Sequence, residues 1–219
     1  MKTIIINGSP KGEGGNTHIF ASHFIKGMGM SCEMRCIVKE DYRSLAEEIE
    51  NFDSVVFIMP LYVHAMPGIV MKLLEHMKTL ELGNRSMGFI IQSGFTEPAQ
   101  SRFAKRYFEQ VSNRLKYNYL GTVIKGGAAG TYLMPDNMNK KLFTALEELG
   151  SYYNKTGQFS EKVIGGFEKN YQMSKRAAMF QQFLNKTGLG NMFWNSMLKK
   201  HNAFDRRFDK PFSRTIKGS

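Results

Sequence analysis

Short apolar runs alternate along the chain with stretches in which apolar residues recur every three or four positions. The runs predict buried strands, and the helical spacing predicts helices that pack against them. Five strand–helix pairs in succession indicate an α/β fold with a parallel sheet covered on both faces. We expect strands at residues 4–6, 32–38, 54–59, 87–92 and 120–125, and helices at 17–28, 44–52, 69–80, 97–115 and 139–153.

The loop after the first strand is rich in small residues and lies directly before a helix. The first amides of a helix lack carbonyl partners, and the helix dipole places partial positive charge there, so this is an anion site. Donor groups come from Ser9, Asn16 and Thr17, and Lys11 adds a cation. The pattern predicts a phosphate-binding loop. The alternative is a glycine-rich turn whose helix is capped by Asn16 or Thr17.

Two common phosphate loops do not match this segment. A Walker A loop has Lys directly before Ser or Thr, whereas Asn16 precedes Thr17 here. The dinucleotide fingerprint has three glycines in G-x-G-x-x-G spacing, and Gly12, Gly14 and Thr17 supply two of the three. A cradle for a single phosphate, of the kind used for FMN, remains.

The loop after the third strand, residues 60–68, is apolar, although loops normally face water. We therefore expect something flat and apolar to cover it. Another loop, residues 93–96, follows the fourth strand. When the strand order is 2-1-3-4-5, ligands bind where the order reverses, and the loops after strands one, three and four become neighbours.

These motifs resemble the NAD(P)H-dependent FMN reductases of the flavodoxin-like superfamily. The resemblance rests on residues 8–11 followed by 15–17, and on residues 60–62 ahead of Met66, Pro67 and a helix containing Lys72. It covers about residues 1–155. It implies a flavodoxin-like three-layer α/β sandwich with a five-stranded parallel sheet of order 2-1-3-4-5.

The resemblance also implies the contacts with the cofactor. The FMN phosphate would lie on Ser9, Lys11, Asn16 and Thr17. The isoalloxazine ring would lie between two groups of residues, namely Pro60, Leu61, Tyr62 and Val63 on one side and Ser93, Gly94 and Phe95 on the other.

Two features depart from the family pattern. The first loop is one residue longer than the expected form. Some relatives carry a cysteine cluster after the second strand that holds an iron–sulfur centre, and residues 39–43 contain no cysteine. We therefore expect flavin without iron–sulfur and no other metal.

The chemistry would come from the flavin, which takes hydride from NADH or NADPH at N5 and passes it to an acceptor. Backbone amides of residues 61–63 would stabilise negative charge on the reduced ring. We assign no catalytic acid or base. His64 is the only titratable side chain in the ring-side loop besides Tyr62, and a hydrogen-bonded histidine without proton transfer is the favoured interpretation. Tyr62 either stacks on the flavin or packs as an ordinary aromatic residue.

Composition limits the remaining possibilities. Cys32 and Cys36 alternate with Glu33 and Arg35, which predicts core cysteines on one strand face and too few ligands for a metal. The sequence shows no secretory signal and no apolar run long enough to span a membrane, so we expect a cytoplasmic protein.

The net charge of +11 is concentrated in the last third of the chain. We expect residues 1–158 to form the FMN-binding domain and residues 159–219 to form a basic, amphipathic helical extension. The extension either docks on the domain or a second copy, as in a homodimer or homotetramer, or lies on an anionic membrane surface. No nucleic-acid-binding module is present, and no nucleic-acid partner is expected.

Two functions remain open at this point. One is an FMN-dependent NAD(P)H oxidoreductase acting on flavin, quinone, nitro or azo compounds. The other is a flavodoxin-type electron carrier without its own small-molecule substrate. Carriers are usually acidic and compact, whereas this chain is basic and carries an extension, which favours the enzyme. A fold relative without flavin is the third possibility.

Overall fold

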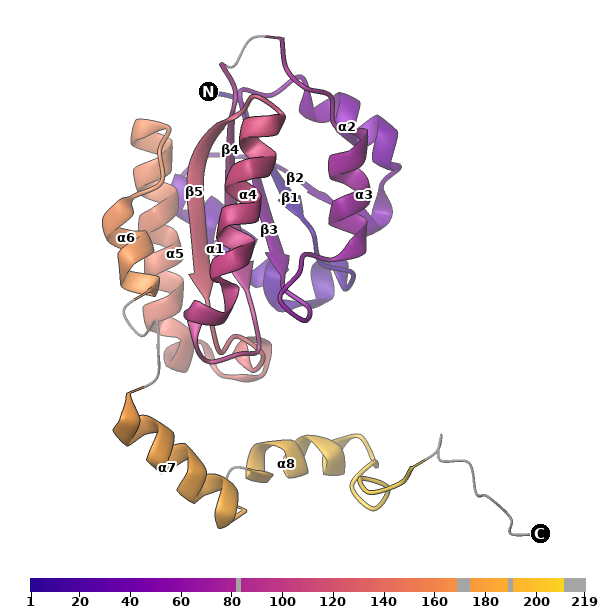
Figure 1. Cartoon of the computed structure of the whole chain (residues 1–219), viewed down its shortest axis with the longest axis vertical. Helices are drawn as coiled ribbons and strands as arrows, with labels where there is room; N and C mark the ends of the chain where they lie inside the picture. Colours follow the sequence, from indigo (N-terminus) through magenta and orange to yellow (C-terminus); the bar gives the residue numbers. More distant parts are fainter. Residues whose placement is uncertain (82–83, 169–173, 189–190, 211–219) are drawn as a thin grey trace, which may run out of the picture. The chain divides into compact units, whose positions relative to one another are not determined.

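The computed structural model describes residues 1–81, 84–168, 174–188 and 191–210. Its centre is a five-stranded parallel sheet of order β2-β1-β3-β4-β5 (Figure 1). This is the flavodoxin-like order, so the predicted fold class is confirmed. The strands are β1 (Thr3–Asn7), β2 (Glu33–Cys36), β3 (Ser54–Pro60), β4 (Ser86–Gln92) and β5 (Asn118–Lys125).

The strands divide their side chains between two cores. In β1, Ile4 and Ile6 face one core and Ile5 faces the other, and all three are fully buried. The same alternation continues in the neighbouring strand, where Phe57 and Ile58 face opposite sides. A strand buried on both faces is the arrangement that a continuous apolar run predicts.

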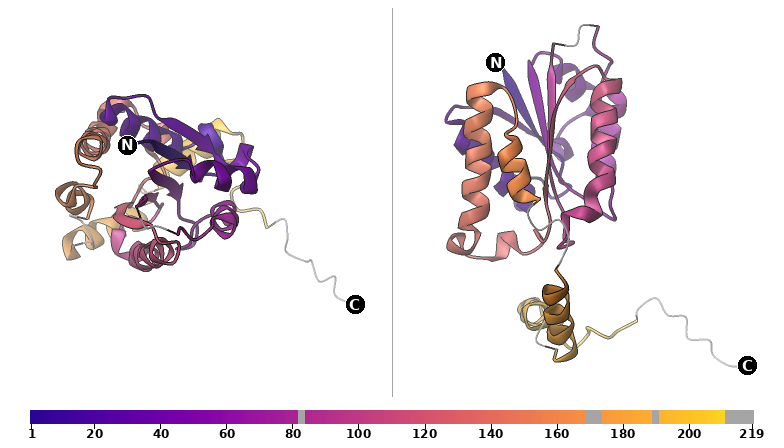
Figure 2. Two further views of the ribbon diagram at one scale, coloured as in Figure 1. Left: turned by 90° about the horizontal axis from the view of Figure 1, so that it is seen from above. Right: turned by 60° about the vertical axis from the view of Figure 1, so that its left-hand side comes forward.

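Helices cover both faces of the sheet, which gives the three layers seen in Figure 2. Residues of α2, α3 and α4 contribute to one core, and residues of α1, α5 and α6 contribute to the other. The bounds are α1 (Asn16–Met28), α2 (Tyr42–Ile49), α3 (Gly68–His76), α4 (Arg102–Arg114), α5 (Asp136–Thr156), α6 (Glu161–Phe167), α7 (Lys175–Lys186) and α8 (Met192–Lys200).

Helices α1 and α5 approach each other unusually closely. A Cβ on Gly27 would lie 2.0 Å from the carbonyl oxygen of Glu147, and a Cβ on Gly150 would lie 2.0 Å from that of Phe24. Only glycine allows the two backbones to meet in this way. Around this contact the Glu147 carboxylate accepts hydrogen bonds from Lys26 at 2.8 Å and from His23 at 2.8 Å. These contacts fix α1, whose first turn borders the predicted phosphate loop.

Several predicted elements have different bounds in the structure. The second strand is shorter than residues 32–38, because the backbone turns into a 3₁₀ turn at Ile37–Lys39. The predicted helix at 97–115 is a 3₁₀ turn at Pro98–Ser101 followed by α4. Cys36 is buried, and Cys32 is half buried with its thiol 3.1 Å from the Thr3 carbonyl.

The chain divides into two compact units, Met1–Gln172 and Met173–Ser219. Helix α6 belongs to the first unit, although it lies inside the range predicted for the extension. It packs there through Val163 and Ile164, and Lys105 of α4 pairs with Glu168 at 3.0 Å. The second unit contains α7 and α8. None of the helices in the described ranges has both the length and the apolar character needed to cross a bilayer.

Candidate functional site

Four loops follow the carboxyl ends of neighbouring strands. We name them the β1 loop (residues 8–15), the β3 loop (61–67), the β4 loop (93–97) and the β5 loop (126–135). Strand β3 pairs with β1 on one side and with β4 on the other, and β4 pairs with β5. The four loops therefore lie next to one another at one edge of the sheet (Figure 1).

The β1 loop is held by hydrogen bonds within itself. The Ser9 amide donates to Asn7 Oδ1 at 3.0 Å, and Asn7 Nδ2 donates to the Gly12 carbonyl at 2.9 Å. Ser9 is buried, and its Oγ accepts a bond from the Lys11 amide at 3.2 Å. Asn7 was not predicted as a residue of this loop, because a polar residue at the end of a strand does not by itself indicate a partner five residues later.

Helix α1 starts without a side-chain cap. Gly15 occupies the N-cap position, so the alternative of a cap formed by Asn16 or Thr17 is wrong. The His18 amide donates to the Gly15 carbonyl at 3.1 Å, and the Asn16 and Thr17 amides come before the first hydrogen bond of the helix. Together with the helix dipole, they leave partial positive charge beside Ser9 and Lys11.

Asn16 and Thr17 connect the start of α1 to the other loops. Asn16 Nδ2 donates to the Ala128 carbonyl at 2.6 Å, and Asn16 Oδ1 accepts from the Tyr132 amide at 2.9 Å. Thr17 Oγ1 accepts from Gln92 Nε2 at 2.7 Å. Two of the four predicted phosphate ligands, Asn16 and Thr17, thus also join the start of α1 to the end of β4 and to the β5 loop.

Gln92 is a further polar residue at this edge of the sheet, and it was not predicted from the sequence. Its side chain is buried, and its Oε1 has no hydrogen-bond partner among the described residues. A buried polar atom without a partner costs about 1–3 kcal/mol. This side chain therefore places an unpartnered hydrogen-bond acceptor close to Thr17.

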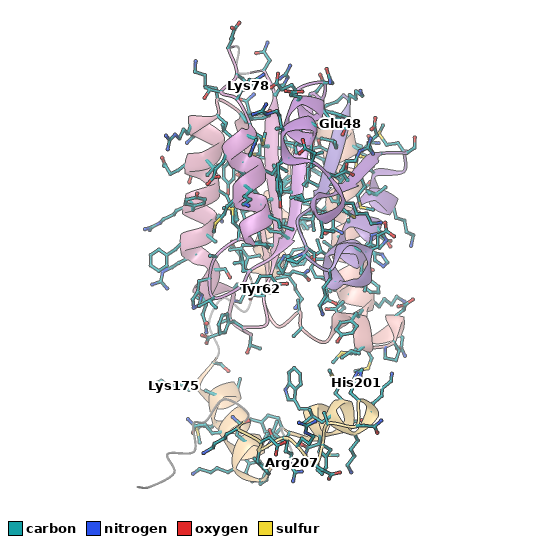
Figure 3. All side chains as sticks on the ribbon, turned by 90° about the vertical axis from the view of Figure 1, so that its right-hand side faces the viewer. Glu48, Tyr62, Lys78, Lys175, His201 and Arg207 are labelled. Atoms are coloured by element: carbon teal, nitrogen blue, oxygen red, sulfur yellow. The ribbon has the colours of Figure 1, made fainter. Side chains whose placement is uncertain are left out.

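The β3 loop is a two-residue hairpin with an unusual backbone. Tyr62 and Ala65 exchange backbone hydrogen bonds of 2.9 and 3.0 Å, and Val63 and His64 between them have φ values of 49° and 68°. Two left-handed residues are typical of a type I′ turn, in which Asn and Gly are preferred. A β-branched residue in this conformation is strained. Val63 is 86% exposed, and Tyr62 lies at the carboxyl edge of the sheet (Figure 3).

The rest of this loop is anchored inward. Leu61 is buried, and its amide donates to the Gln92 carbonyl at 2.7 Å. Pro60, the last residue of β3, pairs with Gln92 in the sheet register. Among the predicted ring-side residues, Pro60 and Leu61 are therefore held against β4, whereas Tyr62 and Val63 form the exposed tip of the loop.

The β4 loop joins its neighbours on both sides. The ring of Phe95 stacks on His64, with centroids 4.8 Å apart and planes 5° apart. The Phe95 carbonyl accepts from the Gly127 amide at 2.6 Å, and the Ser93 carbonyl accepts from the Ala128 amide at 2.9 Å. Ser93 Oγ also donates to the Phe95 carbonyl at 3.3 Å.

Gly94 lies between these two residues and faces the β5 loop, because a Cβ on Gly94 would lie 3.8 Å from Ala129 Cβ. The β4 loop residues predicted from the sequence, Ser93, Gly94 and Phe95, therefore occupy the space between the β3 and β5 loops.

His64 makes a second contact in this region. Its Nδ1 donates to the Gln100 carbonyl at 3.1 Å. The imidazole is thus held by one hydrogen bond and one stacked ring. This agrees with the interpretation of His64 as a hydrogen-bonded loop residue.

The charges near the site are mainly positive. Lys11 is exposed, and its Nζ lies 5.6 Å from the centroid of the Tyr132 ring. Lys125, at the end of β5, donates to the Gly126 carbonyl at 2.5 Å, and burial lowers the pKa of its ammonium group. Glu13 is paired with Lys39 at 2.7 Å, which lowers the pKa of that carboxyl group. In the described ranges, no group of three His, Cys, Asp or Glu side chains is arranged to hold a metal ion.

The structure is similar to solved structures of several reductases. An NADPH-quinone reductase from P. pentosaceus matches with a TM-score of 0.54 and 19% identity, over 68% of this chain and 96% of its own. An FMN-dependent NADH-azoreductase from Bacillus anthracis, in complex with FMN, matches with a TM-score of 0.53 and 14% identity, over 70% and 100%. The chain has the flavodoxin-like fold.

A third match covers a larger share of this chain than the first two. An NADH:FMN oxidoreductase in its apo form has a TM-score of 0.52 and 12% identity, over 80% of this chain and 92% of its own. No protein-family model and no curated protein matches the sequence. At these identities the similarity establishes the fold, and the predicted resemblance is confirmed at that level.

Proposed function

We propose that this protein is an FMN-dependent oxidoreductase that takes hydride from NADH or NADPH and passes it to a small acceptor. One observation carries the proposal. Loops from four separate strands are joined at one edge of the sheet by the side chains of Asn16, Gln92 and His64. In flavodoxin-like folds a mononucleotide binds at this edge.

The β1 loop fits the phosphate of FMN. The hydroxyl groups of Ser9 and Thr17 each accept one hydrogen bond, so each hydroxyl hydrogen remains available for a phosphate oxygen. One amide hydrogen of Asn16 is used by Ala128, and the second remains. Lys11 and the first amides of α1 supply positive charge.

The loops after β3 and β4 fit a flat ring. On one side they offer Pro60, Leu61, Tyr62 and Val63, and on the other Ser93, Gly94 and Phe95. Tyr62 is 48% exposed and Phe95 is 42% exposed, so apolar surface at the site faces outward. A planar aromatic ligand would cover this surface and remove it from water.

Bound FMN would supply the redox chemistry by accepting hydride and then transferring it to the acceptor. The chain's part is to bind and orient the reactants. The Leu61 and Tyr62 amides already donate to backbone carbonyls, so the Val63 amide is the member of the predicted trio left to stabilise negative charge. His64 Nδ1–H is occupied by Gln100, and we assign His64 no proton-transfer role.

The proposal includes several finer points. The acceptor would be a flavin, quinone, nitro or azo compound. The active form would be a homodimer or homotetramer, and the protein would work in the cytoplasm, where NADH and NADPH are found. The names of the matched reductases and the basic charge of the chain support an enzyme over a flavodoxin-type electron carrier.

Turnover by the purified, FMN-loaded protein tests the proposal. We expect oxidation of NADH or NADPH that depends on an added quinone or azo compound. The double variant Ser9→Ala/Lys11→Ala should lose FMN and activity together. Lys140→Ala, which removes an exposed charge from α5, should retain both. FMN binding without oxidation of either nicotinamide would indicate the carrier, and absence of FMN binding would overturn the proposal.

A further inference from the structure

The α7–α8 unit, Met173–Ser219, holds most of the positive charge of the protein. Its sequence contains ten Lys and Arg and two Asp, which gives +8 of the total +11. The first unit contains 20 Lys and Arg against 17 Asp and Glu, a net charge of +3. Neither α7 nor α8 contains an acidic residue. The side chains of Lys175 and Arg207 in this unit are labelled in Figure 3.

The same unit exposes large apolar side chains. Met179, Phe180 and Phe183 of α7 are 70%, 63% and 58% exposed, and Met192 and Trp194 of α8 are 64% and 54% exposed. Isolated helices of this length are marginally stable in water unless an apolar face is covered. The apolar face of α7 and the exposed Met192 and Trp194 side chains of α8 would therefore be covered by a partner that is apolar in part.

Cationic groups lie directly beside aromatic rings after α8. The Arg207 guanidinium lies 3.9 Å from the centroid of Phe204 and 4.6 Å from that of Phe208, and Lys199 Nζ lies 5.0 Å from Phe204. Such neighbours suit a boundary between an apolar layer and an anionic one, because the rings enter the first and the charged heads remain in the second.

We propose that the α7–α8 unit binds the surface of an anionic phospholipid bilayer. Charge favours this partner over a second copy of the chain, since both units carry a net positive charge. Anionic lipid headgroups complement the lysines and arginines, and the acyl boundary takes the exposed Phe, Met and Trp side chains. The unit would lie on the membrane without crossing it.

Trp194 makes the proposal directly measurable, because it is the only tryptophan of the chain. We would add vesicles of phosphatidylcholine, with or without phosphatidylglycerol, to the full-length protein. Vesicles with the anionic lipid should shift the Trp194 emission to shorter wavelength and carry the protein into the vesicle pellet. Pure phosphatidylcholine should do neither. Raising salt from about 0.1 M to about 1 M, which shortens the Debye length from about 10 to about 3 Å, should weaken binding.

Charge reversal tests the assignment to α8. Lys199→Glu/Lys200→Glu should weaken vesicle binding at least about tenfold. The matched reversal Lys140→Glu/Lys141→Glu, on two exposed residues of α5, should leave binding within about twofold of the original protein. Circular dichroism of both variants establishes that they are folded.

Three results would overturn the proposal. The first is an unchanged Trp194 emission with anionic vesicles at low salt. The second is equal weakening by the α5 reversal. The third is an emission shift that rises with protein concentration without vesicles, which would assign the apolar faces to a second copy. None of these results depends on FMN, so the membrane proposal and the oxidoreductase proposal can fail separately.

Discussion

Gln92 Nε2 donates a hydrogen bond of 2.7 Å to Thr17 Oγ1, and both residues are buried. The bond joins the end of β4 to the first turn of α1, between residues 75 positions apart in sequence. It fixes the start of α1 relative to the sheet edge while Gln92 Oε1 remains without a partner among the described residues. The start of α1, beside the predicted phosphate-binding loop, is thereby connected to the strand that leads into the β4 loop.

Loss of this connection should weaken FMN binding. Gln92→Ala removes the hydrogen bond to Thr17, which supports the start of α1. It should weaken FMN binding about fivefold, because one buried hydrogen bond is worth about 1 kcal/mol. Ser112→Ala is the control, since Ser112 is also buried and donates to the Phe108 carbonyl within α4. Fluorescence titration of FMN measures both. Equal affinities for the two variants would contradict the role of Gln92.

The close contact of α1 and α5 should be intolerant of a methyl group. Gly150→Ala would force a Cβ to within 2.0 Å of the Phe24 carbonyl oxygen, and we expect a loss of about 3 kcal/mol in the free energy of unfolding. Gly165→Ala, in α6, meets nothing within 4 Å and should instead gain about 0.5–1 kcal/mol. Urea denaturation compares the two, and a loss of similar size in both would refute the packing argument.

A residue that tolerates left-handed backbone at the tip of the β3 loop should increase the stability of the protein. Val63 has a φ of 49° and is 86% exposed, so Val63→Asn relieves strain with little loss of apolar burial. We expect stabilisation of about 1 kcal/mol. Val38→Asn is the control, because Val38 is exposed but lies in a right-handed 3₁₀ turn and should gain nothing. Thermal unfolding measures the stability of both variants. A rise in the stability of Val38→Asn alone would contradict the strain assigned to Val63.

Stability should fall at alkaline pH. Burial raises the pKa of the Cys32 thiol from 9.0 to about 11, and burial also raises the pKa of the Cys36 thiol. Below 9.0 both the folded and the unfolded chain hold the Cys32 proton, so pH has no effect through this group. Between 9.0 and about 11 the unfolded chain loses the proton first, which favours unfolding.

The test is the slope of unfolding free energy against pH in that window. Cys32→Ala should make the slope less steep, and Cys32 in the folded protein should react slowly with alkylating reagents because the thiol stays protonated. A slope unaffected by Cys32→Ala would show that other groups cause the alkaline loss.

Strands and the positions of the loops were predictable because their signals are local. The apolar run Ile4–Ile6 and the run from Val55 to Met59 each indicate a strand covered on both faces, and the observed β1 and β3 contain them. The small residues after β1 likewise indicate the turn and the helix start. Parallel strands then place their carboxyl ends at one edge.

The features that were not predicted from the sequence depend on contacts between residues far apart in the chain. Helix α6 contains Gly165 and Gly166, which weaken any local helix pattern, and it forms because Ser160 caps it and Ile164 packs into the core. The bond from Gln92 to Thr17 is invisible in the sequence for the same reason. Propensity and spacing describe neighbours along the chain, whereas these features arise from tertiary packing.

The central claim is that a single phosphate-bearing flavin binds across the joined loops, and comparison of FMN with riboflavin tests it most directly. Equilibrium titration of the purified protein, followed by flavin fluorescence, should show saturable binding of one FMN per chain. Riboflavin lacks the phosphate that Ser9, Lys11, Asn16 and Thr17 would bind, and its affinity should be at least about tenfold lower. Equal affinities, or no binding of FMN, would contradict the account.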